Sequence, residues 1–451
     1  MSSLAIENSK QLLERASQIL DKDSPVEIRN LVHSLYPAET AHILESLEPE
    51  KRIKIWSVIP PSVMGEILVE VNVDLGSFLL SITDRKDLIA ACENLGSDSM
   101  VDLLHVLPEP LLSQVIETIG TQNRSRFEKS LQYAENTAGG LMSQDVLTVR
   151  SDVTLDVVAR YLRLRGNIPA SIDSLIVVDR TEQFQGTLPL SQFLASDPHK
   201  RVADVMDSRK IAVSYSMPTR DVVKLIEQRN LLSVPVVADD GKVIGRIALD
   251  DVVDVIREEA NHSLLGMAGL TDEQDMFSPV MTSAKRRAVW LGINLLTAFL
   301  AAWVIDLFED TIQQIVALAV LMPIVASMGG IAGSQTLTLV IRGLALQQVS
   351  SENTMSLLFK EISVALVNGL VWSVVVASVA GFWFHDAHLG LLLGSAMMIN
   401  LVCAALSGVT IPVVLDKMGI DPALAGGVLL TTITDVVGFM AFLGLATLFL
   451  L

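Results

Sequence analysis

The last part of the sequence contains five long, nearly uninterrupted apolar segments, and these constrain the fold more than any other feature. Each is at least about 20 residues long, the length that an α-helix needs to cross the hydrocarbon core of a bilayer. Backbone polar groups must be paired in hydrocarbon, so segments of this kind form helices. Residues 285–451 are therefore predicted to form an α-helical membrane domain with five transmembrane helices. The segments are Ala288–Phe308, Ile315–Leu346, Leu357–Phe384, Leu389–Leu415 and Ala423–Leu451.

The basic residues around these segments predict their orientation. All six from Lys285 onward lie at the ends that adjoin the N-terminal part of the chain: Lys285, Arg286, Arg287, Arg342, Lys360 and Lys417. Because loops rich in Lys and Arg stay in the cytoplasm, we expect a cytoplasmic N-terminus and a C-terminus outside. The first residues lack the basic and apolar regions of a signal peptide. We expect a multi-pass protein of the cytoplasmic (inner) membrane, surrounded by membrane lipid.

The part of the chain before the membrane domain is acidic. Residues 1–284 carry 42 acidic and 27 basic side chains. This excess of negative charge argues against nucleic acid as a partner and favours association with cations. The two cysteines, Cys92 and Cys403, lie in different parts of the chain. Neither a disulfide framework nor a cysteine metal site is therefore indicated.

Residues 1–135 show a repeat of twelve residues. Short breaks recur at this spacing, beginning at Leu47, Ile59, Val71, Thr83, Leu95, Leu107 and Ile119. Between the breaks, apolar residues recur at intervals of three and four, and several breaks carry a proline that starts a helix. The pattern predicts an all-α domain of stacked short helices, similar in logic to helical repeats. No catalytic constellation is present, so we interpret it as an interaction or regulatory domain.

Residues 136–255 contain two copies of one α/β module. The segments that begin at Leu141 and Val205 correspond, and each is followed by a helical pattern, an apolar strand, a turn and a second strand. The turn at Asp239–Lys242 is typical of a tight hairpin. The two copies resemble a tandem pair of CBS domains. Many CBS pairs bind adenosine ligands through a Ser or Thr shortly before an Asp, but Ala248 occupies that place, which argues against ATP binding here.

Residues 256–284 are predicted to form an acidic connecting helix. Helical spacing places Asp250, Asp254 and Glu258 on one face, with Glu259 beside them. Like charges at this spacing repel, so the face gains if a divalent cation binds, and Mg²⁺ prefers carboxylate oxygens and water. The alternative is a solvated charged face without a ligand.

Asp435 is the one ionisable residue of the fifth apolar segment, near its midpoint. A carboxylate there is costly unless it faces water or a partner, so it is a functional hypothesis by default. Helical spacing places Thr431, Thr432, Val428 and Gly427 on the same stripe. These small or hydroxylated residues could line a hydrated path. The alternative is that Asp435 is a protonated, hydrogen-bonded packing residue.

The second apolar segment contains Pro323 and, further on, Gly329 and Gly330. Proline and glycine loosen a membrane helix, and the freed carbonyls are tolerated only against protein or water. Together with Asp435 they suggest a pore. However, Gly329 and Gly333 also form a Gly-xxx-Gly motif, for which helix packing alone is an alternative.

These features together resemble the MgtE family of magnesium channels over essentially the whole chain. The stretches that carry the resemblance are Asn136-Thr-Ala-Gly-Gly-Leu-Met, the CBS pair, Met322-Pro-Ile-Val-Ala-Ser-Met-Gly-Gly, Asp421-Pro-Ala and Thr431-Thr-Ile-Thr-Asp435. The family implies a homodimer whose pore lies on the twofold axis, lined by the second and fifth spans, with hydrated Mg²⁺ at Asp435. It also implies a plug-like connecting helix and regulatory cytosolic Mg²⁺, which keeps the pore closed. The positions that match this role are Asp250, Glu258, Glu259 and Asp421.

Two departures from the family pattern bear on this expectation. Ile331 stands where the family usually has Asn beside the pore glycines, which predicts an altered pore wall. Asn261, His262 and Ser263 stand where the family's connector usually continues with Thr, Glu and Asp. The loss of two carboxylates predicts weaker binding of regulatory Mg²⁺.

Two other classes of function are alternatives to a Mg²⁺ channel. A proton- or Na⁺-coupled transporter of divalent cations would use Asp435 as its coupling group. An intramembrane aspartyl protease needs two carboxylates that share a proton, and only one mid-membrane Asp is present, so no enzyme is expected. Oxygen ligands do not by themselves separate Mg²⁺ from Mn²⁺ or Co²⁺.

Overall fold

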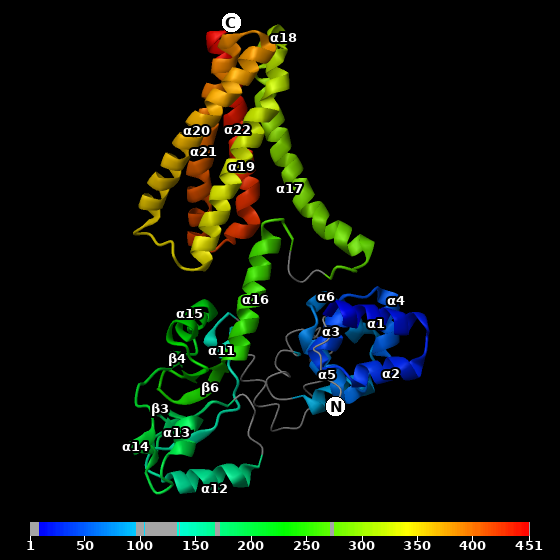
Figure 1. Ribbon diagram of the computed structural model, residues 1–451, viewed down its shortest axis with the longest axis vertical. Coiled ribbons are helices and arrows are strands. Elements are labelled where there is room, and N and C mark those ends of the chain that lie inside the picture. The colour runs from blue at the N-terminus through cyan, green and yellow to red at the C-terminus, as the bar shows by residue number, and fades with distance from the viewer. Residues whose placement is uncertain are drawn as a thin grey trace. The chain divides into compact units, whose positions relative to one another are not determined.

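The computed structural model describes residues 9–95, 103, 133–134, 136–166, 172–270 and 275–450 (Figure 1). The chain forms two compact units. The first comprises Met1–Ala260 with Glu273–Ser278, and the second comprises Asn261–Asp272 with Pro279–Leu451. Helix α16 (Leu249–Gly266) therefore begins in the first unit and ends in the second.

The described N-terminal helices confirm the repeat of twelve residues. From α2 to α7 a helix begins at every twelfth position, and the first four of these begin with a proline, whose fixed φ and missing N–H suit the first helical position. Their apolar faces share one core, in which Leu44, Ile55 and Ile67 are fully buried. The predicted breaks at Leu107 and Ile119 lie outside the described residues. The helices are α1 (Ser9–Asp21), α2 (Pro25–His33), α3 (Pro37–Glu45), α4 (Pro49–Trp56), α5 (Pro61–Glu70), α6 (Val73–Ile82) and α7 (Arg85–Asn94).

The two predicted CBS modules have the same fold. Each has a three-stranded sheet in which the first strand pairs parallel with the second and the second pairs antiparallel with the third. The predicted hairpin turn joins β5 to β6, with Gly241 at a φ of 80°. The first sheet contains β1 (Thr148–Arg150), β2 (Ser174–Val178) and β3 (Phe184–Pro189), and the second β4 (Val213–Ser214), β5 (Ser233–Val237) and β6 (Val243–Ala248). The helices are α11 (Ala138–Leu141), α12 (Leu155–Arg165), α13 (Leu190–Ala195), α14 (Val202–Val205) and α15 (Thr219–Arg229).

The modules contact each other in a reciprocal way. Thr187 of the first forms a bridge with Asp207, and Arg246 of the second forms one with Ser143. A Cβ on Gly186 would collide with the Asp207 carbonyl oxygen. This close approach of backbone to backbone requires glycine.

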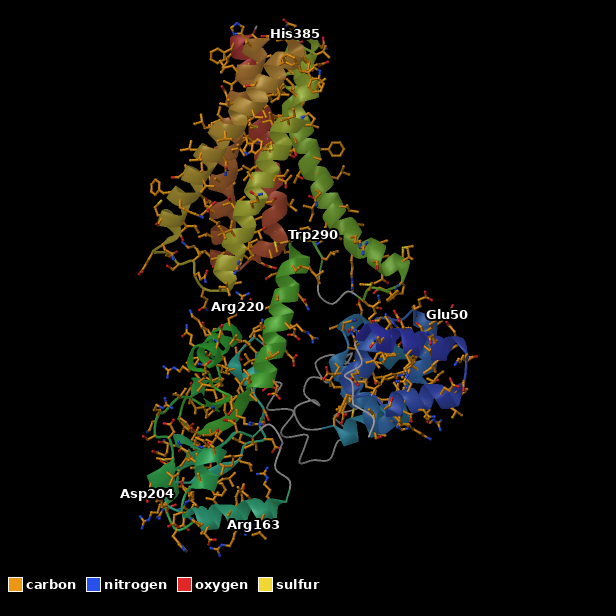
Figure 2. All side chains as sticks on the ribbon, in the orientation of Figure 1. Glu50, Arg163, Asp204, Arg220, Trp290 and His385 are labelled. Carbon is orange, nitrogen blue, oxygen red and sulfur yellow. The ribbon has the colours of Figure 1, made fainter. Side chains whose placement is uncertain are left out.

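The second unit contains the five predicted transmembrane helices, which the structure confirms within a few residues at most ends. The main difference is α17, which begins at Val280 and not at Ala288, because the helix continues through its basic segment beyond the apolar part that hydropathy detects. His385 ends α20 in the left-handed conformation, at the turn before α21 (Figure 2). The helices are α17 (Val280–Asp306), α18 (Glu309–Gln314), α19 (Ala317–Ala345), α20 (Thr354–Phe384), α21 (Ala387–Lys417) and α22 (Pro422–Phe449).

Helix α21 is central to this unit. Half of its most apolar 18-residue stretch is buried, against 6% of the corresponding stretch of α20 and 11% of that of α17. It packs against α19, α20 and α22. The exposed apolar surfaces of α17 and α20 suit contact with lipid. Helices α19 and α22 also pack against each other through small residues, since Gly333 contacts Leu430 and Gly426 contacts Leu337.

Candidate functional site

Helix α22 begins as its sequence predicts. Asp421 is the N-cap, and its Oδ1 accepts a hydrogen bond of 2.9 Å from the N–H of Ala423, while Pro422 occupies the first helical position. From Asp421 to Asp435 the helix rises by about 21 Å at 1.5 Å per residue. Because 14 residues are close to four full turns, both carboxylates lie near one side of the helix.

The stripe that contains Asp435 is polar and accessible. Thr431 is exposed and its hydroxyl donates to the Gly427 carbonyl at 2.9 Å, while Thr432 donates to the Val428 carbonyl at 2.7 Å. With their protons engaged inside the helix, both hydroxyl oxygens retain lone pairs that can accept bonds from the waters of a cation. A Cβ added at Gly427 would meet no neighbouring atom within 4 Å, so the stripe is open there.

The Asp435 carboxylate is half-buried and has no hydrogen-bond or ion-pair partner among the described residues. Interpretation as a packing residue would require such a partner, because a buried polar group without one is costly. The absence of a partner in the described part of one chain is what the hydrated-path interpretation expects, and the role of Asp435 stays a prediction.

Helix α19 presents a second polar stripe. An open groove follows one face of this helix and is lined by Gly330, Ile331, Ser334, Gln335 and Thr338. Gly330, Ser334 and Thr338 are four residues apart, as are Ile331 and Gln335, so the five form one strip along the helix. Hydroxyl and amide side chains on a membrane helix normally face protein or water. Ile331, the departure from the family pattern, is 55% exposed on this line.

The two neighbouring glycines of α19 have different surroundings. Gly329 is buried against α21, where an added Cβ would lie under 3.0 Å from the Asn400 side chain. Gly330 has nothing within 4 Å of the position of a Cβ. The structure thus assigns a packing contact to Gly329 and an open position to Gly330, and the pore role of both stays a prediction. Helix α19 is continuous through Pro323 and both glycines, and the loosening expected from the sequence stays a prediction.

Asn400 of α21 connects two helices, as expected of a polar residue in a span. It is fully buried, and its Nδ2 donates to the Val325 carbonyl of α19 at 2.9 Å. Asn294 of α17 does not connect helices in the described part of the chain. Its amide donates to the Trp290 carbonyl of its own helix, one turn earlier, because no other helix covers that exposed position.

Sequence reasoning missed one buried acid, Glu361 of α20. Its side chain is 7% exposed, and it contacts Lys360 at 2.6 Å. Its second oxygen accepts a hydrogen bond of 3.2 Å from Thr336 of α19. Charged residues near the end of an apolar segment are ordinarily assigned to the interface, and only the position of α19 shows that this carboxylate is buried.

The end of α16 approaches the start of α22 within the second unit. His262 Nε2 lies 2.9 Å from Asp421 Oδ2, and the Cβ position of Gly266 lies 3.2 Å from Ala423. His262, which stands where the family has a carboxylate, therefore contacts one of the predicted regulatory residues directly. The sequence shows that residue 262 departs from the family pattern, but it does not predict that His262 contacts Asp421.

The remaining predicted regulatory residues lie on α16 but do not form a cluster. Asp250, Asp254 and Glu258 are exposed on the predicted face, whereas Glu259 forms an ion pair of 2.5 Å with Arg220. Among the described residues of one chain, no three His, Cys, Asp or Glu side chains are close enough to hold a metal ion. Their role in Mg²⁺ regulation stays a prediction.

The start of α16 has no hydroxyl for an adenosine ligand. Ala248 is buried, and its N–H donates to Asp251 Oδ2 at 2.8 Å, so this carboxylate caps the helix. Asp251 is thus already engaged by the backbone of Ala248.

Comparisons with known proteins agree with this architecture. The family profile MgtE, described as a divalent cation transporter, matches residues 322–445. The MgtE intracellular N domain matches residues 35–136, and a CBS domain matches residues 202–258. The magnesium transporter MgtE of Bacillus subtilis is 27% identical over 433 residues, covering 96% of each chain. That of Thermus thermophilus is 27% identical over 430 residues, covering 94% of this chain and 95% of the relative.

The solved cytosolic domain of the Mg²⁺ channel MgtE in complex with ATP has the same fold as the first part of this chain. It superposes with a TM-score of 0.50 at 24% identity, and covers 54% of this chain and 99% of its own. Five helices long and apolar enough to cross a membrane complete a multi-pass membrane protein. With the N domain, the CBS module and the membrane domain all matched in the same order, this chain belongs to the MgtE family.

Proposed function

We propose that this protein transports Mg²⁺ across the membrane along the polar stripe of α22, past Asp435. The observation that supports this most directly is the half-buried Asp435 carboxylate without a partner, aligned with Thr431 and the open Gly427 position. Relatives that span the full chain are named magnesium transporters. No enzymatic activity is proposed.

We infer that the working unit is a homodimer with the pore on its twofold axis. The polar stripe of α19, with Ser334 and Gln335, and the exposed Thr431 of α22 would contact lipid in a single chain. A second copy of the chain would cover these stripes and place two Asp435 carboxylates near the axis. Two charges make a cation site that one charge makes only weakly.

The chemistry of these residues suits a hydrated ion. Mg²⁺ loses its waters reluctantly and is usually held by one or two carboxylates with several waters retained. Asp435 supplies the charge, and the Thr431 and Thr432 hydroxyl oxygens accept hydrogen bonds from the retained waters. Binding must also be weak enough for release, which water-mediated contacts favour. Mn²⁺ and Co²⁺ have the same ligand preference in kind and are candidate competitors.

We propose that Mg²⁺ on the N-terminal side regulates the pore at α16 and Asp421. The exposed carboxylates of Asp250, Asp254 and Glu258 are suitable hard ligands, and α16 ends against the start of α22. Because His262 replaces a carboxylate and already occupies Asp421, regulation is expected to require more Mg²⁺ than in relatives that keep the acid.

We propose that the N-terminus lies in the cytoplasm and the C-terminus outside the inner membrane. The basic residues stand at matching helix ends, with Arg342 in the last turn of α19 and Lys417 in the last turn of α21. ATP binding by the CBS pair is not part of the proposal, since Ala248 lacks the hydroxyl and Asp251 caps α16.

A proton- or Na⁺-coupled transporter is the second candidate, since an unpaired carboxylate such as Asp435 could also carry a coupling proton. Flux measurements under different gradients separate the two. A channel responds to voltage and to the Mg²⁺ gradient, whereas a coupled transporter stops when the proton and Na⁺ gradients are removed.

The test is Mg²⁺ flux into liposomes that contain wild type or Asp435→Ala, with intact dimers shown for both. Leu429→Ala, on another face of α22, serves as the control variant. We expect Asp435→Ala to reduce flux to the level of empty liposomes, and Leu429→Ala to leave it near wild type. Unchanged flux in Asp435→Ala would place the ion path elsewhere.

A further inference from the structure

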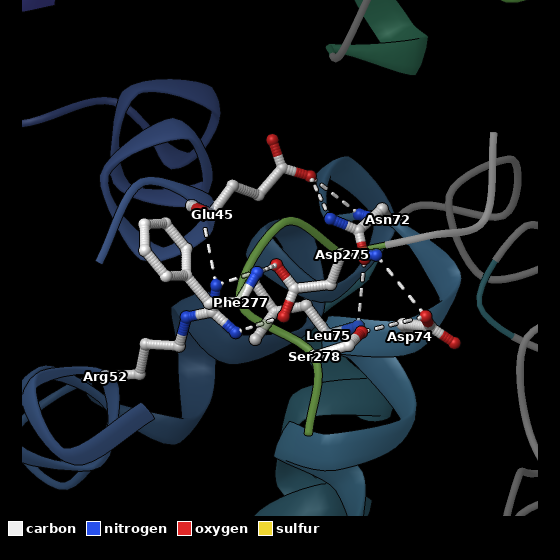
Figure 3. A network of polar contacts seen from close by, with 8 residues as sticks. All are labelled: Glu45, Arg52, Asn72, Asp74, Leu75, Asp275, Phe277 and Ser278. Atoms are coloured by element: carbon white, nitrogen blue, oxygen red, sulfur yellow. Dashed lines mark hydrogen bonds and ion pairs between the residues drawn. The ribbon is translucent and has the colours of Figure 1, made fainter. Parts of the chain in front are cut away.

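A buried ion pair joins the N-terminal helices to the segment that precedes the first membrane helix. Arg52 of α4 is 2% exposed and Asp275 is 7% exposed, although they are 223 residues apart in the sequence. The guanidinium contacts the carboxylate through both of its terminal nitrogens, with Nη1–Oδ2 at 2.5 Å and Nη2–Oδ1 at 2.8 Å (Figure 3). This bidentate geometry is the strongest arrangement for an Arg–carboxylate pair.

Neighbouring residues hold both partners in place. Nη2 of Arg52 also donates to the Glu45 carbonyl at 3.1 Å, and its guanidinium lies 5.5 Å from the centre of the Phe277 ring. Asp74 accepts from the N–H of Asp275 at 3.3 Å and from the Ser278 hydroxyl at 3.2 Å (Figure 3). The segment is therefore recognised through its charge, its ring, its hydroxyl and its backbone.

The receiving surface is itself fixed by a second set of bonds. Glu45 Oε1 accepts from the backbone and the side-chain amide of Asn72, at 2.8 and 2.9 Å. Asn72 Oδ1 in turn accepts from the N–H of Leu75, so Asn72 caps α6 two residues before Asp74. Glu45, Arg52 and Asp74 thus come from three helices, α3, α4 and α6, that one polar network holds together.

The Arg52–Asp275 pair differs from surface ion pairs because both of its side chains are buried. Moving two charges out of water costs about as much as their attraction returns, so the pair adds little net stability, but losing one partner leaves a buried charge and is costly. Lys54, two residues along α4, forms a pair of 2.6 Å with Asp23, but both side chains are largely exposed. Such a surface pair contributes little. Specific binding of one segment is therefore the best explanation of the Arg52 site.

The position of this segment in the chain suggests its purpose. Asp275, Phe277 and Ser278 belong to the first compact unit, whereas Pro279 onward belongs to the second, and α17 begins at Val280. We propose that Arg52 and Asp74 of the N-terminal helices hold Asp275 and Phe277 in an intramolecular clamp, which ties the N-terminal domain to the first membrane helix. Movement of this domain is then transmitted through the backbone of residues 275–279 to α17.

The clamp itself is tested by hydrogen exchange of the full-length protein in nanodiscs. The peptide that covers residues 275–278 should be protected in wild type, and Asp275→Ala should speed its exchange by about 100-fold, as expected when one partner of a buried pair is removed. Lys54→Ala, which breaks the exposed pair on the same helix, should leave the exchange unchanged. Exchange of this peptide at the unprotected rate in wild type would overturn the proposal.

Coupling to the membrane unit rests on the proposed transport function and has its own measurement. Mg²⁺ flux of Asp275→Ala in liposomes should differ from wild type by about fivefold or more, a usual size for coupling between sites, while Lys54→Ala should match wild type. Arg52→Asp repeats the test from the other partner. Equal flux in wild type and Asp275→Ala would overturn the clamp as a coupling device. A wild type without Mg²⁺ flux would refute the transport function instead, and the exchange measurement would still decide whether the clamp exists.

Discussion

The two neighbouring glycines of α19 allow the packing and pore interpretations to be separated by one pair of substitutions. An added Cβ at Gly329 would lie under 3.0 Å from the Asn400 side chain, whereas an added Cβ at Gly330 meets nothing within 4 Å. Asn400 cannot move away easily, because a Cβ on Gly438 would also lie only 2.7 Å from its Nδ2. The amide is therefore enclosed between α19 and α22.

The cost of Gly329→Ala has two parts. Overpacking of a filled site costs about 1–3 kcal/mol. Displacement of Asn400 also breaks its 2.9 Å bond to the Val325 carbonyl, and interhelical hydrogen bonds in membranes contribute about 0.6 kcal/mol on average, up to about 1.7. We therefore expect Gly329→Ala to lower the free energy of unfolding by about 2–4 kcal/mol. Gly330→Ala should lie within about 0.5 kcal/mol of wild type, as open surface positions do.

Equilibrium unfolding in mixed detergent micelles measures both values under identical conditions. Asn400→Ala provides the check on mechanism: in the Gly329→Ala background it removes the collision, so the double variant should be more stable than the sum of the single effects predicts. If Gly329→Ala and Gly330→Ala were equally stable, the packing argument would be refuted. If Gly330 lines the ion path, Gly330→Ala should lower Mg²⁺ flux without loss of stability.

Two further predictions concern the polar contacts of the second unit. His262→Glu restores a carboxylate beside Asp421, so protection of the full-length protein from limited proteolysis should appear at lower Mg²⁺ than in wild type; the same Mg²⁺ requirement in both would contradict the role of His262. Glu361→Gln can still accept the Thr336 hydrogen bond and should fold nearly as stably as wild type. Glu361→Leu leaves that hydroxyl without its acceptor and should lower the free energy of unfolding by about 1–3 kcal/mol in the same micelle assay, and equal stability of the two variants would count against the bond.

The parts of the fold that could be predicted from the sequence are those with a local physical cause. A proline at the first helical position stands at Pro25, Pro37, Pro49 and Pro61, and each start depends only on the residues beside it. The membrane helices follow from hydropathy in the same way, except where α17 extends into a polar region that hydropathy does not register. The Asp435 stripe was predictable because helical spacing alone aligns its members.

The contacts that were not predictable join residues with no local relation. Nothing near Arg52 indicates Asp275, and nothing near Glu361 indicates Thr336. His262 was visible as a departure from the family pattern, but its contact with Asp421 depends on where α16 ends against α22. Each of these pairs is set by the packing of separate elements, so the sequence supplies the chemistry of the partners without their identity.

The two aspartates that matter most in these proposals differ in how the fold treats their charge. Asp275 is buried and fully paired with Arg52, so its carboxylate is part of the packing. Asp435 is half-buried and has no partner in the described part of the chain, so packing does not require its charge. Replacement by asparagine should therefore affect transport at Asp435 and local structure at Asp275. Asp435→Asn keeps the shape of α22 and should abolish Mg²⁺ flux while leaving unfolding unchanged. Asp275→Asn leaves the Arg52 guanidinium without its counter-charge and should expose residues 275–278 to exchange. A large loss of stability in Asp435→Asn would show that this carboxylate is structural, and the ion path proposed for it would have to be withdrawn.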